Sequence, residues 1–252
     1  MFTDRLFAAL MFFTRLPLWR IHRPRPESFG RVVDFWPVAG WLTGGTMAVV
    51  FWWCSQHFPA LVAALMAVAA RMLLTGALHE DALADFFDGF GGGTTRERIL
   101  AIMKDSRTGT YGVLALVMHT ALFVALLAAL PRVPAVVFTA DVYAKACGSM
   151  LIAQLPYART AEGAKSGVVY RPWRGRGLLF HLLRCVVAVL PGVVWLYCVC
   201  PGFAWWAFLV PPVVEVLLML RMKRRLGGYT GDCCGAVFLL CELSFYAAAA
   251  FF

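Results

Sequence analysis

The chain has little charge and no long polar stretch. Only 15% of its 252 residues are Asp, Glu, Lys or Arg, whereas a soluble domain carries roughly 25%. Hydrophobic residues make up 61%, and the mean hydropathy is +0.73. These values exclude an ordinary soluble enzyme and favour a protein that crosses a membrane several times. Because no polar segment is long enough for a separate soluble core, we expect residues 1–252 to form one domain.

Other signals are missing as well. The chain has no internal repeat, and its eight cysteines have no C-x-x-C spacing of the kind that binds zinc. Most of these cysteines lie in apolar runs, where a thiol behaves as a small core residue. The apolar run at 6–13 is short and lacks a small-residue cleavage site, which disfavours a signal peptide. It predicts an amphipathic helix at the membrane interface.

Seven apolar segments are long enough to span a bilayer, since a helical span needs about 20 residues. They cover 36–55, 59–78, 110–130, 134–155, 179–198, 201–222 and 235–252. The predicted fold class is all-α: a polytopic integral membrane protein with about seven transmembrane helices, an N-terminal interfacial helix and a short cytoplasmic surface helix. Gly40, Gly44 and Gly45 offer a small-residue packing surface. Pro211 and Pro212 predict a kink in the sixth span.

Basic residues are concentrated on one side of the predicted bundle. If the N-terminus is cytoplasmic and the spans alternate, nineteen of the 23 Lys and Arg residues fall in the cytoplasmic segments. These segments are 1–35, 79–109, 156–178 and 221–234. The excess agrees with the positive-inside rule. The basic loops either bind lipid headgroups only or also recognise phosphate, and composition leaves both readings open.

The few acidic residues cluster where an apolar segment ends. Glu80, Asp81, Asp85 and Asp88 occur within nine residues. On a helix, Asp85 lies about 40° from Asp81, and Asp88 lies about 20° to the other side, so the three carboxylates share one face. Such carboxylates repel each other unless a cation neutralises them, and oxygen ligands suit Mg²⁺ or Mn²⁺. The pattern predicts a metal site at Asp81, Asp85 and Asp88; the alternative is a solvated acidic helix end.

A second polar segment follows at 105–110. Thr94 and Glu97 predict a capping box that starts a surface helix over 95–104. The turn after this helix offers backbone N–H groups, hydroxyls and a guanidinium, which suit a phosphate group. Its residues are Asp105, Ser106, Arg107, Thr108, Gly109 and Thr110. His79 points away from Asp81 on a regular helix, which disfavours it as a general base and favours a structural role.

The third polar segment, 227–232, precedes the last span. Asp232 is the only acid of the 221–234 loop, which carries Arg and Lys at 221–225. Asp232 either caps the final helix or contacts a metal or substrate, and the pattern leaves both open.

Charged residues also occur inside the spans. Asp141 and Lys145, four residues apart, predict a buried ion pair. The intramembrane acids Glu215 and Glu242 either pair with Arg71 or Arg184 or, with Asp141, serve a proton-coupled transporter. A transporter would be expected to show discontinuous helices in two matching halves, which the sequence lacks.

These segments together resemble the cobalamin synthase family, the adenosylcobinamide-GDP ribazoletransferases. The likeness rests on HEDALADFFDG at 79–89, DSRTGTYG at 105–112 and GGYTGDCCGA at 227–236, with weaker matches at 13–17 and 156–159. It extends over essentially the whole chain. Two departures occur: Glu80 stands where the family has an apolar residue, and Ala82 stands where it has a glycine. Both leave the three-aspartate face intact.

The resemblance implies a bacterial inner-membrane enzyme whose N-terminus and active-site loops are cytoplasmic. It would transfer the phosphocobinamide moiety of adenosylcobinamide-GDP to α-ribazole or its 5′-phosphate and release GMP, with Mg²⁺. Expected partners are these substrates, the lipid bilayer and other cobalamin-assembly enzymes, but no nucleic acid. The expected site comprises the metal ligands Asp81, Asp85 and Asp88, the catalytic residues Asp105, Arg107 and Asp232, and the substrate contacts Glu80, Ser106, Thr108, Gly109, Thr110, Arg159, Thr230 and Gly231.

Two other enzyme classes share part of this pattern. CDP-alcohol phosphotransferases and aspartate-rich membrane prenyltransferases also use Mg²⁺, acidic helix faces and diphosphate substrates. Their usual aspartate spacings differ from that of Asp81, Asp85 and Asp88. Neither class explains the 105–112 segment.

Overall fold

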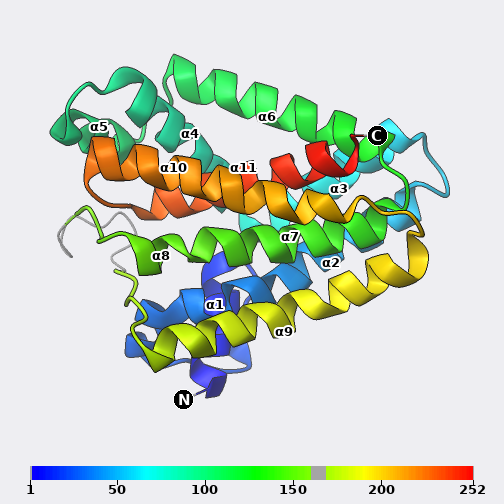
Figure 1. Cartoon of the computed structure of the whole chain (residues 1–252), viewed down its shortest axis with the longest axis horizontal. Helices are drawn as coiled ribbons and strands as arrows, with labels where there is room; N and C mark the ends of the chain where they lie inside the picture. Colours follow the sequence, from blue (N-terminus) through cyan, green and yellow to red (C-terminus); the bar gives the residue numbers. More distant parts are fainter. Residues whose placement is uncertain (1, 160–168, 252) are drawn as a thin grey trace.

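The structure is a computed structural model that describes residues 2–159 and 169–251, and all its named elements are helices (Figure 1). The α-helices are α1 (Phe2–Phe13), α2 (Trp36–Cys54), α3 (Ala60–Thr75), α4 (Leu78–Gly92), α5 (Arg96–Lys104), α6 (Thr110–Ala129), α7 (Val133–Ser149), α8 (Leu151–Gln154), α9 (Arg176–Val199), α10 (Val210–Leu226) and α11 (Gly231–Ala249). The 3-10 helices are η1 (Leu18–Arg20), η2 (Pro26–Phe35) and η4 (Trp205–Leu209). The predicted all-α class is confirmed.

The multi-pass membrane class is also confirmed, but the number of seven spans is not. Within the described residues, five stretches are long and apolar enough to cross a bilayer. They are Thr110–Ala129, Val133–Gln154, Arg176–Val199, Trp205–Leu226 and Gly231–Ala249. α3 and α4 meet at 90° and would together make a sixth. α2 covers the first predicted span but is not among the five, and its 19 residues include four tryptophans and three glycines.

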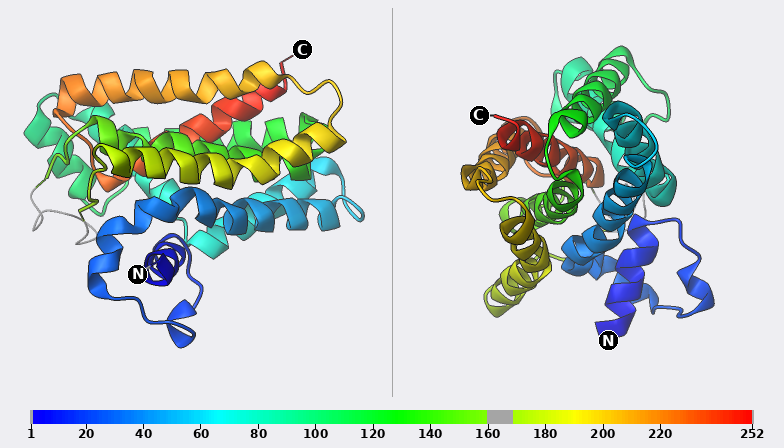
Figure 2. Two further views of the ribbon diagram at one scale, coloured as in Figure 1. Left: turned by 60° about the horizontal axis from the view of Figure 1, so that its bottom comes forward. Right: turned by 90° about the vertical axis from the view of Figure 1, so that its right-hand side faces the viewer.

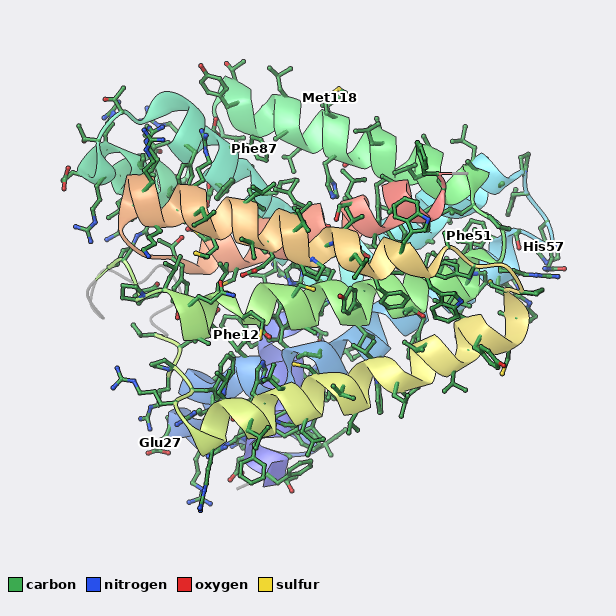
Figure 3. All side chains as sticks on the ribbon, viewed as in Figure 1. Phe12, Glu27, Phe51, His57, Phe87 and Met118 are labelled. Carbon is green, nitrogen blue, oxygen red and sulfur yellow. The ribbon has the colours of Figure 1, made fainter. Side chains whose placement is uncertain are left out.

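The long helices lie side by side along the longest axis of the molecule (Figure 1). α7 and α11 are the interior ones, because 83% and 72% of their apolar windows are buried, against 28% or less for α6, α9 and α10. The outer helices therefore turn large apolar side chains outward, such as Met118 on α6 (Figure 3). Outward-facing apolar side chains are favourable where the solvent is lipid.

Small residues let α2 and α7 approach closely. A Cβ atom on Gly40 would lie 2.9 Å from Cα of Val142, and one on Gly44 would lie 2.9 Å from Cβ of Asp141. The predicted packing surface is confirmed at these two positions. Gly45 does not belong to it, because a Cβ there would meet nothing within 4 Å.

The adjacent Gly44 and Gly45 give a matched test of the packing between α2 and α7. Gly44→Ala is expected to destabilise the protein by about 1–3 kcal/mol, because the added methyl group overpacks the α2–α7 contact. Gly45→Ala is expected to be neutral or to stabilise by up to about 1 kcal/mol, because alanine favours the helix. Unfolding of both variants in detergent measures the difference. Equal stability of the two would contradict the close contact.

A charged network fills the interior between α2, α3, α7 and α11. Arg71 Nη1 donates to both oxygens of Glu242, at 2.7 and 2.6 Å. Lys145 Nζ pairs with Asp141 Oδ1, which also accepts a hydrogen bond from Thr43 at 2.8 Å. The predicted Asp141–Lys145 pair and the pairing of Glu242 with Arg71 are confirmed. The paired state of Asp141 and Glu242 favours the structural interpretation over proton transport, whereas Oε1 of Glu215 has no hydrogen-bond partner among the described residues.

Arg184 does not join this network. Its Nη1 lies 3.5 Å from Oδ2 of Asp34, which also lies 3.1 Å from Arg5 Nη1. Trp173 Nε1 donates to the other oxygen of Asp34 at 2.6 Å. The buried carboxylate of Asp34 therefore connects Arg5 of α1, Arg184 of α9 and Trp173, which precedes α9. α1 itself lies across the long helices, since it is seen nearly end-on where they are seen from the side (Figure 2, left).

Three local predictions were wrong. Pro211 and Pro212 do not kink a span; they lie in the first turn of α10, where a missing N–H group costs no helical bond. α11 begins at Gly231 rather than 235. The cap of α5 is Thr95, whose side chain accepts from the backbone N–H of Arg98 at 3.2 Å, and not Thr94.

Candidate active site

A hollow of about 210 Å³, here called the main hollow, lies between the N-terminal region and the starts of α4 and α11. The segment at 157–159 and Tyr170 complete it. Its lining comprises Phe12, Phe13, Val33, Trp36, Leu78, His79, Asp81, Ala82, Tyr157, Arg159, Tyr170, Gly231, Asp232, Cys234 and Gly235. Asp81 and Asp232, two carboxylates that lie 151 positions apart in the sequence, thus line one hollow.

Backbone hydrogen bonds hold the segments around the main hollow. The N–H of Ala158 donates to the carbonyl of Tyr229 at 2.8 Å, and the N–H of Tyr229 donates to the carbonyl of Pro156 at 3.0 Å. Arg96 of α5 donates to the carbonyls of Leu226 and Ala158, at 2.9 and 2.8 Å. The two segments that resemble family motifs at 156–159 and 227–236 are therefore joined directly.

The close contact of α4 with α11 places the two carboxylates. A Cβ atom on Gly235 would lie only 2.5 Å from Cβ of Ala82, so this glycine allows the helices to touch. Thr230 caps α11, because its side chain accepts from the N–H of Cys233 at 3.3 Å. The alternative in which Asp232 is the helix cap is therefore wrong. Asp232 instead occupies the first turn of α11, where the helix dipole favours an anionic side chain.

Asp88 holds a different segment. Its oxygens accept hydrogen bonds from the backbone N–H groups of Gly109, at 2.6 Å, and Gly112, at 2.8 Å. This carboxylate therefore anchors the 105–110 turn and the start of α6 onto α4. A Cβ atom on Gly112 would lie 2.5 Å from Asp88 Oδ2, so the close approach requires glycine.

The three aspartates of α4 do not line one common hollow. Asp81 is exposed and lines the main hollow, Asp85 is buried, and Asp88 lines a second hollow of about 430 Å³, the outer hollow. The outer hollow is lined by Asp88, Gly92, Arg98, Ala101, Ile102, Asp105, Arg107, Gly109, Thr110 and Tyr111. No group of three or more His, Cys, Asp or Glu side chains among residues 2–159 and 169–251 is placed to hold a metal ion.

The donor set still fits one kind of magnesium site. Mg²⁺ is usually bound through one or two carboxylates, with substrate phosphates and water completing the octahedron. Asp81 and Asp85 lie one helical turn apart on α4 and supply such a pair. The chemistry therefore fits an ion that the substrate brings or completes, and not a self-contained site of three aspartates.

In the 105–110 turn, Asp105 and Arg107 pair with each other. Arg107 Nη2 lies 2.7 Å from Asp105 Oδ2, and Arg107 Nε donates to Oδ1 at 3.0 Å. These hydrogen bonds lower the pKa of Asp105 to about 2. Such a carboxylate is ionised but accepts a proton weakly near neutral pH. Both side chains line the outer hollow together with Gly109 and Thr110, whereas Ser106 and Thr108 are exposed on the turn.

Two other residues predicted from the sequence lie apart from the main hollow. Glu80 is buried with one oxygen 3.8 Å from Arg71 Nη2, and neither of its oxygens has a hydrogen-bond partner among the described residues. Its role as a substrate contact stays a prediction. Thr230 is buried as the cap of α11. Arg159 and Gly231, in contrast, line the main hollow as a substrate contact requires.

Sequence reasoning missed the aromatic part of the main hollow. Trp36, Tyr157 and Tyr170 line it with Phe12, which Figure 3 labels. His79 is buried in a stack with Phe13 and Trp36, in keeping with the structural role expected for it. Only Phe13 and Tyr157 carried a signal, because they lie in segments that resemble family motifs. Tyr170 and Trp36 reach the hollow through tertiary packing alone.

Comparison with known proteins agrees with these features. A profile of the cobalamin-5-phosphate synthase family matches residues 5–250. The adenosylcobinamide-GDP ribazoletransferase of Shewanella oneidensis is 35% identical over 249 residues, which cover 96% of this chain and 92% of that protein. The protein of the same name from Leptothrix cholodnii is 37% identical over 249 residues, which cover 95% of this chain and 92% of that protein. No solved structure matches.

Proposed function

The chain belongs to the cobalamin-5-phosphate synthase family, and from this premise we propose that it joins the two halves of cobalamin in the main hollow. It is a membrane transferase that moves the phosphocobinamide moiety of adenosylcobinamide-GDP to α-ribazole or α-ribazole 5′-phosphate and releases GMP. The observation that carries the location is the presence of Asp81, Asp232 and Arg159 on one hollow.

The reaction needs a nucleophile, a place for the proton and stabilisation of the leaving group. A ribose hydroxyl of the acceptor attacks the phosphorus on the cobinamide side of the diphosphate. A new O–P bond forms as the bond to the bridging oxygen breaks, and GMP leaves with that oxygen. The proton of the hydroxyl passes to a carboxylate that lines the hollow.

Asp232 is the better candidate for the proton acceptor. It lines the main hollow at the start of α11, in the first turn. Asp105 lines the outer hollow, and its pairing with Arg107 lowers its pKa to about 2. A base that holds protons so weakly contributes little near neutral pH. The roles of Asp105 and Arg107 in catalysis stay predictions.

Asp81 and Asp85 are proposed to hold Mg²⁺ together with oxygens of the diphosphate. The bound ion would neutralise negative charge on the diphosphate and on the leaving GMP. We assign Asp88 to positioning, because it anchors the 105–110 turn to the same helix. Its predicted role as a third ligand stays a prediction, as does phosphate binding by Ser106, Thr108, Gly109 and Thr110.

The bacterial inner membrane, with the hollow open to the cytoplasm, is the proposed location. Most nitrogen-bearing side chains lie toward the end of the bundle that carries α5 and the start of α9 (Figure 3). This agrees with the positive-inside rule. In the 156–178 loop, positions 160–168 lie outside the described residues.

The proposal is tested by GMP release from purified protein in detergent, with adenosylcobinamide-GDP and α-ribazole 5′-phosphate. Wild-type turnover is expected to require Mg²⁺ and to stop when a chelator is added. Asp81→Asn is expected to raise the Mg²⁺ concentration for half-maximal rate by about 10-fold or more, because one carboxylate ligand is lost.

Glu97→Gln is the matched control for Asp81→Asn, since this exposed carboxylate on α5 lines none of the hollows. Its Mg²⁺ dependence is expected to equal that of the wild type. Turnover without any divalent cation, or an unchanged Mg²⁺ requirement in Asp81→Asn, would overturn the proposed metal site. Failure of the wild type to release GMP would overturn the reaction itself.

A further inference from the structure

We propose that the main hollow binds the α-ribazole half of the reaction, and that Arg159 distinguishes α-ribazole 5′-phosphate from α-ribazole by binding the 5′-phosphate. This inference rests on the proposed function, and it assigns the two substrates to different places. The activated cobinamide approaches Asp81 with its diphosphate, while the base and ribose of the acceptor occupy the hollow.

The size of the main hollow favours the smaller substrate. A cavity of roughly 150 Å³ accommodates a benzene molecule, and the main hollow measures about 210 Å³. A flat heteroaromatic base with part of its ribose is of this order, whereas a corrin ring with its side chains is several times larger. The corrin therefore remains outside, and only its diphosphate arm needs to reach Asp81.

The lining matches a flat aromatic base. Phe13, Trp36, Tyr157 and Tyr170 come from four separate segments and meet at this one hollow. Bases stack on such side chains with roughly 1–3 kcal/mol for each contact. A lining made of aliphatic side chains alone would not offer this interaction.

Two ring nitrogens in the lining lack partners. Trp36 Nε1 and His79 Nε2 are both buried, and neither makes a hydrogen bond among the described residues. Their side chains are 1% and 3% exposed. A buried polar atom left unpaired costs about 1–3 kcal/mol, so a ligand whose polar groups reach these nitrogens would be stabilised. The hydroxyls of a ribose both donate and accept hydrogen bonds, and they suit either nitrogen.

Arg159 is the one arginine or lysine among the described residues that line the main hollow. The other formally charged side chains there are the carboxylates of Asp81 and Asp232, which repel a phosphate dianion. Arg159 Nη2 donates to the carbonyl of Leu100 at 3.0 Å, which fixes the guanidinium in place at α5. A guanidinium presents a rigid fork of N–H donors that matches phosphate oxygens.

The test compares the two acceptors in the same assay at saturating adenosylcobinamide-GDP. Arg159→Gln is expected to lower kcat/KM for α-ribazole 5′-phosphate about 30-fold or more, because a charge-assisted phosphate contact is lost. For α-ribazole, which lacks the phosphate, kcat/KM is expected to change less than about 3-fold. Arg159→Lys keeps the charge without the fork and should give an intermediate preference for the phosphate.

Arg96→Gln is the matched control. Arg96 also ties α5 to neighbouring carbonyls but does not line the main hollow, so its loss should affect both acceptors equally. An equal loss of kcat/KM with both acceptors in Arg159→Gln would show that Arg159, like Arg96, only holds α5 in place, and it would overturn the proposal. An unchanged preference for the phosphate in Arg159→Gln and Arg159→Lys would overturn it too.

Binding separates this inference from the proposed reaction. Added α-ribazole 5′-phosphate should stabilise the wild type but not Arg159→Gln. The unfolding temperature of each protein in detergent, with and without this ligand, measures the difference. If the wild type released no GMP, the proposed function would fail, while the ligand-induced change in unfolding temperature would still test the binding site. If the wild type turned over but the shift were the same in both proteins, the role of Arg159 alone would fail.

Discussion

Replacing Asp232 with asparagine is expected to lower the rate of GMP release about 10²- to 10⁴-fold, the usual contribution of a general base. The amide keeps the size of the side chain and its place in the first turn of α11, but it accepts no proton. KM for both substrates should change little, because the change affects the transition state more than the ground state. Steady-state kinetics of the purified variant measure both parameters.

The pH dependence provides a second measurement on the same protein. In the wild type, kcat should fall as the pH drops through the pKa of the base, because the protonated carboxyl accepts no proton. Asp232→Asn should lose this acidic limb. A variant that kept it would show that the limb belongs to another group.

Asp105→Asn is the control for the identity of the base. Asp105 is bound to Arg107, and its pKa of about 2 leaves it ionised at all pH values in the assay. Its replacement is expected to lower the rate less than about 10-fold, through a looser 105–110 turn. If Asp105→Asn were the slower of the two variants, the assignment of the base to Asp232 would be wrong.

The all-α membrane fold could be predicted from the sequence because lipid leaves few alternatives. Long apolar runs must satisfy their own backbone hydrogen bonds, and helices do so within one segment. The ends of the helices were harder to predict. Pro211 and Pro212 suggested a kink, yet they open α10 after a 3-10 turn, because proline fits the first turn of a helix as well as a kink.

The number of spans also depends on more than hydropathy. The second predicted span, 59–78, ends at Thr75, where Gly76 and Ala77 adopt positive φ values and the chain turns by 90° into α4. Within the apolar run only Gly76, a residue typical of a helix end, marks this turn, and a single glycine does not predict its angle. The backbone N–H of Arg15 donates to the carbonyl of Leu74 at 2.7 Å, so a segment 59 residues earlier in the chain packs against the bend.

The acidic face of α4 could be predicted, but the partners of its residues could not. Helical spacing correctly places Asp81, Asp85 and Asp88 on one helix. It does not reveal that Gly109 and Gly112 donate to Asp88, because this contact joins positions more than twenty residues apart. Likewise, the local pattern identified Asp232 as a candidate. That Asp232 and Asp81 line the same hollow depends on the packing of Gly235 against Ala82, which the pattern does not reveal.

Replacing Arg71 with methionine is expected to destabilise the folded protein by about 3–5 kcal/mol. Arg71 is 1% exposed, and its guanidinium pairs with Glu242 and lies 3.6 Å from Asp141 Oδ2. Methionine fills much of the same volume, but it leaves Glu242 buried without a cationic partner, which is costly. Unfolding of the variant in detergent, followed by loss of helicity or by gel filtration after heating, measures the change.

The double variant Arg71→Met with Glu242→Met separates the ion pair from simple packing. Replacing both members of a buried pair with apolar residues is often nearly neutral. Here it leaves Glu80, one oxygen of which lies 3.8 Å from Arg71 Nη2, without that cation. The double variant is nevertheless expected to recover most of the stability that Arg71→Met loses, with a coupling energy of about 2 kcal/mol or more. Asp141 keeps its own partners, Lys145 and Thr43. A single variant that lost less than about 1 kcal/mol, or a double variant less stable than the single, would contradict the view that Arg71 chiefly neutralises buried acids.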